Sequence, residues 1–319
     1  MRLVFAALLL AGLSAATLLL PWSPLQSVLH EDPALAQLIL LELRLPRLLL
    51  ALGYGAVLGL TGAALQALFA NPLASPDITG ASSGAALGAV LGGYWLTLTA
   101  PLTLAAAGAA GAVLALVLLF ALAGRRADNP TLLLSGLAIS LAAGAATSLA
   151  LALAPSPFAF YDSFAWLMGS LVDRSLGQAA AALVPAALAC SWLVRRRGAY
   201  DALALGEDVA SSLGHDPGRL RVETILLSGV AIGACVAVCG AIGFIGLVAP
   251  VVARGWTRGH PGRALVPAAM LGSILLVAAD LVTRLAPAGR TIPVGVVTAL
   301  FGIPVFVSLL LRMRWRLAA

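Results

Sequence analysis

Residues 47–70 form the sequence RLLLALGYGAVLGLTGAALQALFA, in which no charged residue follows Arg47. A transmembrane helix needs about 20 consecutive apolar residues, so this stretch is long enough to cross a membrane. Gly55 and Gly59 stand four residues apart, a spacing that lets membrane helices approach closely. The stretch therefore predicts a membrane helix in a tightly packed bundle.

The whole chain extends this pattern. Of its 319 residues, 61% are hydrophobic and 10% are charged, against about 45–50% and about 25% in a soluble domain. This composition excludes an ordinary soluble enzyme and a disordered chain. All 19 basic residues are Arg. Without a Lys, the chain cannot hydrolyse ATP through a Walker loop.

Uncharged stretches predict an all-α polytopic membrane protein, a single domain over residues 1–319. Boundaries are expected to be accurate to a few residues, and the seventh and eighth helices are the least clearly separated. We predict ten transmembrane helices, over residues 3–21, 47–69, 79–98, 102–123, 132–153, 176–194, 222–239, 241–256, 264–286 and 292–311.

The arginines predict the orientation, because cytoplasmic loops of membrane proteins carry an excess of Lys and Arg. With both termini cytoplasmic, fourteen arginines lie inside and five outside. The inner set is Arg2, Arg125, Arg126, Arg195, Arg196, Arg197, Arg219, Arg221, Arg254, Arg258, Arg263, Arg312, Arg314 and Arg316, and the outer set is Arg44, Arg47, Arg174, Arg284 and Arg290. This distribution explains the net charge of +6 without a nucleic-acid partner.

No residue pattern indicates catalysis or a metal site. The three cysteines, Cys190, Cys235 and Cys239, lie in apolar runs, and the three histidines lie in separate loops. Asp280 falls near the outer end of a helix, and Arg284 one turn later offers it an ion pair. With no isolated carboxylate expected in the membrane, the rival class of stand-alone secondary transporters is disfavoured.

Three segments are candidates for function. Arg44 and Arg47, with Arg284, either anchor helix ends at the membrane surface or present positive charge to an acidic soluble partner. Residues 71–77, NPLASPD, contain two prolines that forbid a continuing helix. They form either an ordinary turn or a loop that lines the inner mouth of a pathway.

The third segment, residues 203–214, has the sequence LALGEDVASSLG and predicts a short amphipathic helix. Leu205, Val209 and Leu213 recur every four residues and form one apolar stripe. Such a helix lies on lipid or docks into a partner. The acidic residues favour docking.

Several sequences in the right order resemble the FecCD family of ABC-importer permeases over residues 38–312. They are RLPRLLLALGYGAVLGLTGAALQALFANPLASPDITGASSGAALGA (44–89), LLLSGLAIS (132–140), LALGEDVASSLG (203–214), GAIGFIGLVAPVVAR (240–254) and TIPVGVVTALFGIPVF (291–306). The resemblance implies the type II importer fold of the vitamin B12 permeases. It also implies a transport subunit, not an enzyme, in a bacterial inner membrane. Ala241 and Val251 depart from the family, which usually has Pro and His there.

The resemblance also implies partners. A second permease, identical or homologous, would pair with this one in the membrane lipid. Two cytoplasmic ATPases would bind ATP and Mg²⁺, so this chain itself would need no cofactor. A periplasmic or lipid-anchored binding protein would deliver the cargo.

Site residues carry over from the family by position. Arg44, Arg47 and Arg284 match the arginines that meet the binding protein, and Asn71 and Leu73 match the cytoplasmic gate. Asn129 and Pro130 fall where the second part of that gate lies, although these two residue types differ from those of the vitamin B12 permease. The segment that couples to the ATPase corresponds to Leu205, Gly206, Glu207, Asp208, Val209, Ala210, Leu213 and Gly214. The expected cargo is a ferric siderophore, with haem or cobalamin as alternatives.

Overall fold

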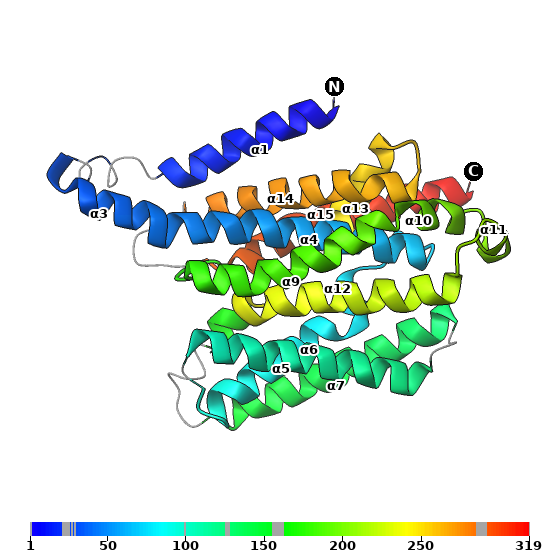
Figure 1. Cartoon of the computed structure of the whole chain (residues 1–319), viewed down its shortest axis with the longest axis horizontal. Coiled ribbons are helices and arrows are strands. Elements are labelled where there is room, and N and C mark those ends of the chain that lie inside the picture. Colours follow the sequence, from blue (N-terminus) through cyan, green and yellow to red (C-terminus); the bar gives the residue numbers. More distant parts are fainter. Residues whose placement is uncertain are drawn as a thin grey trace.

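The computed structural model describes residues 2–20, 26, 28, 30–98, 100–124, 128–154, 163–284 and 292–318. This part of the chain is helical and contains no β-strand. The long helices run side by side along the longest axis of the molecule (Figure 1). The two ends of this bundle differ, with α3 (Pro33–Leu38) at one end and α10 (Arg197–Leu203) and α11 (Glu207–Ser212) at the other. We name them the α3 end and the α11 end.

Each of the ten predicted segments corresponds to a helix. These are α1 (Arg2–Leu19), α4 (Leu45–Leu68), α5 (Ala81–Tyr94), α6 (Pro101–Ala123), α7 (Asn129–Ala152), α9 (Leu176–Arg195), α12 (Pro217–Cys239), α13 (Ile245–Trp256), α14 (Pro261–Thr283) and α15 (Val294–Ala318). In the described residues, seven helical stretches are long and apolar enough to cross a membrane. The count of ten crossings stays a prediction.

Some predictions lie outside the described residues, among them Arg125, Arg126 and Arg290 of the proposed orientation and the last two residues of the predicted helix 264–286. The predicted separation of the seventh and eighth helices is confirmed, since α12 ends at Cys239 and α13 begins at Ile245. The prediction missed α10, which follows α9 almost directly.

The predicted start of the second helix is wrong. The chain is already helical from Pro33, because α3 continues through the π-helix η1 (Ile39–Arg44) into α4. The sequence predicts a start at Arg47 because the uncharged stretch begins there, whereas the charged Glu42 and Arg44 before it are themselves helical. The π turn lies directly before Pro46, which has no N–H to donate within the helix.

Small residues bring α4 and α14 into backbone contact. A side chain at Gly55 would meet the carbonyl oxygen of Gly272, and one at Gly59 would meet that of Ala268. The predicted glycine spacing on α4 therefore serves packing within the chain. The same holds at Gly84 and its neighbours on α5, which pack against α6.

Two of the helices begin inside the bundle. The chain leaves α4 at Leu68, turns at Ala70 (φ +47°) and runs back to the 3₁₀ helix η2 (Pro76–Thr79), from which α5 starts. Between α12 and α13 a second break follows Gly240 (φ +73°), whose carbonyl accepts a hydrogen bond from the Tyr54 hydroxyl at 3.2 Å. The two breaks meet, because a side chain at Gly246 would touch Pro76.

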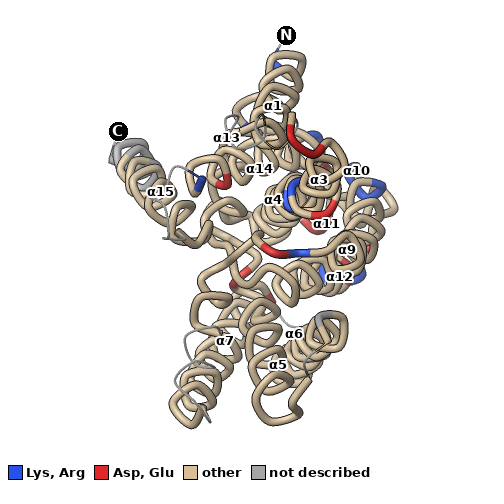
Figure 2. Tube along the Cα trace, turned by 90° about the vertical axis from the view of Figure 1, so that its left-hand side faces the viewer, with Lys and Arg blue, Asp and Glu red and all other residues tan. Residues whose placement is uncertain are grey.

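One part of the bundle, made of α5, α6 and α7, is free of charged residues. The helices α5, α6 and α7 contain none and form a continuous uncharged block (Figure 2). The described arginines lie near the two ends of the bundle, at helix termini or in the loops between helices. This distribution fits a chain whose middle lies in hydrocarbon.

Candidate functional site

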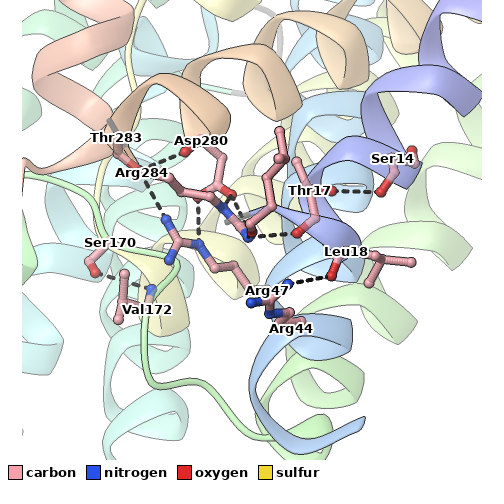
Figure 3. A network of polar contacts seen from close by, with 11 residues as sticks. Ser14, Thr17, Leu18, Arg44, Arg47, Ser170, Val172, Asp280, Thr283 and Arg284 are labelled. Carbon is pink, nitrogen blue, oxygen red and sulfur yellow. Dashed lines mark hydrogen bonds and ion pairs between the residues drawn. The ribbon is translucent and has the colours of Figure 1, made fainter. Parts of the chain in front are cut away.

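The three arginines predicted to meet a binding protein lie together at the α3 end. We call Arg44, Arg47, Arg284 and Asp280 the arginine cluster (Figure 3). Arg47 on α4 pairs with Asp280 on α14 (Nε–Oδ1 2.7 Å) and also donates to the Thr283 hydroxyl at 2.9 Å. Arg284 pairs with the other oxygen of the same carboxylate (3.1 Å). The predicted pair between Asp280 and Arg284 is therefore confirmed, with Arg47 as a second partner.

The helix α1 covers this cluster. Its last carbonyl groups accept hydrogen bonds from Arg44 (to Leu18, 2.6 Å) and from Arg284 (to Thr17, 2.6 Å). Consequently only 18% of the Arg47 side chain and 10% of the Arg284 side chain are exposed, and Asp280 is 1% exposed. Three guanidinium groups against one carboxylate leave the cluster at +2, but most of this charge faces the protein.

The predicted gate residues lie near the α11 end. The Asn71 side-chain oxygen accepts a hydrogen bond from the Leu73 N–H at 2.9 Å and stabilises the turn after α4. Asn129, the first residue of α7, donates a weak hydrogen bond to the Leu68 carbonyl at 3.5 Å. The fold thus brings Asn129 beside the turn that holds Asn71 and Leu73. Pro130 is exposed.

Asp128, directly before α7, caps that helix. Hydrogen bonds from the Thr131 hydroxyl and backbone N–H hold the pKa of the exposed Asp128 carboxyl below its ordinary value. The cap fixes the start of α7, and therefore the position of Asn129.

Residues 203–214 contain the short helix α11 between Gly206 (φ +112°) and Gly214 (φ +83°). Leu205, Val209 and Leu213 are 67%, 41% and 60% exposed, whereas Ala210 is buried. Glu207, the first residue of α11, forms an ion pair with Arg221 on α12 (2.7 Å), and Asp208 follows it in the first turn. All three stripe residues are exposed, but only Val209 lies within α11, so the helix predicted over residues 203–214 is shorter than expected.

The gate turn and the 203–214 segment border one cavity of about 420 Å³, which the sequence did not predict. We call it the inner cavity. Its walls include Leu68, Ala70, Asn129, Leu203, Gly206 and Glu207. Gln66 and Arg254 also line it. The sequence did not indicate either as a site residue, because each lies within an apolar motif. The Gln66 amide donates to the Leu247 carbonyl (3.2 Å), while its buried oxygen has no hydrogen-bond partner among the described residues.

Curated relatives match most of the chain. The vitamin B12 import system permease protein BtuC of Vibrio cholerae serotype O1 is 40% identical over 288 residues, which is 88% of this chain and 84% of the relative. The BtuC protein of Salmonella paratyphi A is 39% identical over 293 residues, with 88% and 85% covered.

Solved structures match the fold. A structure described as an inward-facing conformation of a metal-chelate type ABC transporter superposes with a TM-score of 0.86 at 30% identity, over 98% of this chain and 99% of that one. PsaBC from Streptococcus pneumoniae, solved in complex with a Fab, shares the fold at a TM-score of 0.50 and 16% identity, over 89% and 94%.

The model of the FecCD transport family matches residues 3–312. Its members are permease subunits of ABC transporters, which are not enzymes. They pair with a second permease and with separate ATPase subunits. This chain belongs to the FecCD transport family.

Proposed function

We propose that this chain is the permease of an ATP-driven importer of a metal chelate, with cobalamin as the first candidate cargo. The observation that carries the choice is the 40% identity, over 88% of the chain, to a vitamin B12 import permease. The expected ferric siderophore becomes the second candidate. It is favoured by the resemblance of the quoted sequences, taken together, to permeases for ferric citrate and hydroxamate siderophores, and by the metal-chelate type transporter with which this structure superposes.

In this proposal the α11 end faces the cytoplasm of a bacterium and the chain lies in the inner membrane. The excess of arginines at that end supports this orientation. The exposed stripe of Leu205, Val209 and Leu213 docks into an ATPase subunit. Glu207 and Gly206 also line the inner cavity, so a movement of this segment changes the wall that Asn129 and Ala70 share with it.

The arginine cluster orients the binding protein at the opposite end. Its charge of +2 attracts an acidic surface, and charge complementarity acts mainly on the encounter and the register of two partners. Asn71, Leu73, Asn129 and Pro130 form the cytoplasmic gate, which the ATP cycle of the partner opens and closes. The permease itself contributes the pathway and no chemical step.

Transport in vesicles tests the cargo. The chain is reconstituted with its cognate ATPase and binding protein, and uptake of labelled cobalamin, haem and a ferric hydroxamate is measured with and without ATP. ATP-dependent uptake of cobalamin supports the first candidate, and exclusive uptake of the ferric chelate supports the second. Accumulation of any of them by the chain alone would contradict an ABC importer.

A further inference from the structure

The chain between α4 and α5 carries an acidic residue deep into the bundle. From the sequence, Asp77 lies in a loop at the inner surface. In the structure, the Ser140 hydroxyl donates a hydrogen bond to the Asp77 carbonyl at 3.1 Å. Ser140 is the middle residue of α7, so Asp77 lies about 17 Å from either end of that helix, at a rise of about 1.5 Å per residue.

Neighbouring contacts fix the same depth. A side chain at Gly136 of α7 would meet the Ile78 carbonyl, and one at Gly80 would meet Ile139. The α5 helix, which starts just after this point, has 14 residues and reaches from there toward the α3 end. The segment 71–80 is therefore re-entrant: it turns back from the α11 end to the middle of the bundle.

The expectation of no isolated carboxylate in the membrane is wrong at Asp77, whose environment is unusual for a carboxylate at this depth. The residue is exposed on this chain, and it forms no ion pair with any described residue. Of the helices that contact η2, α5, α6 and α7 contain no charged residue, and the charged residues of α4 and α12 lie near one end of each helix. A carboxylate facing lipid tails is costly, and non-helical backbone at membrane depth is found only inside protein or beside water. Asp77 therefore faces the water-filled pathway or the second permease.

We propose that Asp77 faces the pathway and makes it selective for neutral or cationic chelates over anionic ones. This inference rests on the proposed function, and it names the charge class of the cargo. At about 10 Å and an effective dielectric constant of about 20, one carboxylate disfavours a monoanion by roughly tenfold. The described arginines lie near the bundle ends, so none of them offsets this repulsion at mid-depth.

A structural role is the alternative. The N-termini of η2 and α5 lie at the same place, and an acidic residue in a first turn stabilises the partial positive charge of a helix end. In that case replacing the carboxylate destabilises the permease and lowers the uptake of every cargo by the same factor. Discrimination between cargoes of different charge separates the two roles.

The test uses the complete reconstituted importer and two probes of one size, cyanocobalamin and its anionic monocarboxylate. Initial uptake rates are compared for the unmodified chain, Asp77→Asn and Asp77→Glu. We expect a preference for the neutral probe that falls about tenfold in Asp77→Asn and is retained in Asp77→Glu. The binding protein is the same throughout, so its own preference cancels in the comparison.

Asp216→Asn is the matched control. Asp216 is an exposed carboxylate that caps α12 at the bundle end, and Asn caps equally well. For Asp216→Asn, the ratio of the uptake rates of the neutral and the anionic probe is expected to equal that of the unmodified chain. An unchanged ratio in Asp77→Asn would overturn the inference while leaving cobalamin transport intact.

If the unmodified chain moves no cobalamin, the proposed cargo is wrong, and the same variants are assayed with ferrioxamine B and its anionic N-succinyl derivative. Should Asp77→Asn fail to assemble, a chain that keeps Asp77, with Cys190, Cys235 and Cys239 replaced by Ala and the neighbouring Ser140→Cys, is treated with cationic and anionic thiosulfonate reagents. Labelling of Cys at this position from the aqueous side is expected. Complete protection in the assembled importer would contradict a pathway-facing position.

Discussion

The arginine cluster and the stripe on the 203–214 segment were both predicted to dock partners, yet the structure leaves them in opposite states. In the cluster, Arg47 and Arg284 are largely buried and share Asp280, which is 1% exposed. On the segment, Leu205 and Leu213 are 67% and 60% exposed. The apolar side chains of the stripe stay exposed on the free chain. The charged groups of the cluster instead pair with one another within the chain.

The two surfaces therefore differ in what a partner must do. The stripe is ready to bury apolar area, which favours association directly. In the arginine cluster, the guanidinium groups already bond to carbonyl groups of α1 and to Asp280. A partner can therefore be attracted only by the remaining net positive charge of the cluster. The variants below separate these roles, beginning with the largest expected effect.

Changing the stripe to Leu205→Glu, Val209→Glu and Leu213→Glu together should abolish co-purification of the ATPase. Burial of each such side chain contributes about 1.5–3 kcal/mol, so the triple change costs more than about 4 kcal/mol. The melting temperature of the permease should stay the same, because these side chains are exposed. Ser212→Glu on the same helix is the control. Retained co-purification would show that this segment does not bind the ATPase.

Asp280→Asn should destabilise the permease by about 3–5 kcal/mol, because it leaves two largely buried guanidinium groups without their counter-charge. Thermal unfolding in detergent measures the loss. Glu42→Gln, an exposed acidic residue on η1, should leave the midpoint unchanged. Equal midpoints for both variants would mean that the cluster contributes little to the fold.

Arg44→Glu should weaken binding of the delivery protein by up to about 1 kcal/mol, the upper limit of an exposed ion pair, and less at high salt. Affinity measured at low and high ionic strength checks this expectation. Reversing Arg47 is a poorer test, because it places a second carboxylate beside Asp280. Arg263→Glu at the α11 end should leave the affinity unaffected, and a salt-independent loss in Arg44→Glu would argue for a structural role.

Glu207→Gln should change the stability of the free permease by less than about 0.5 kcal/mol, because Glu207 is 56% exposed in its pair with Arg221. The same unfolding assay used for Asp280→Asn measures it. A loss as large as that of Asp280→Asn would mean that the 203–214 segment is a buried part of the fold rather than a docking surface.

The helices could be predicted because each is encoded locally by an uncharged apolar run. The turn after α4 was also visible through its two prolines, and the separation of α12 from α13 was visible as well. By contrast, Asp280, the partner of Arg47, lies 233 residues away in the sequence. Helix spacing could predict only the pair of Asp280 with Arg284, one turn later. The depth of Asp77 was equally hidden, since re-entry depends on contacts with α7.

The backbone contact of α4 with α14 has a mechanical consequence. With carbonyl groups seated against Gly55 and Gly59, the two helices have no side-chain layer in which to slide. We expect them to move as one rigid unit, with Arg47 and Asp280 at one end and Gln66 and Pro261 at the other. A tilt imposed at either end reaches the far side of the membrane undiminished.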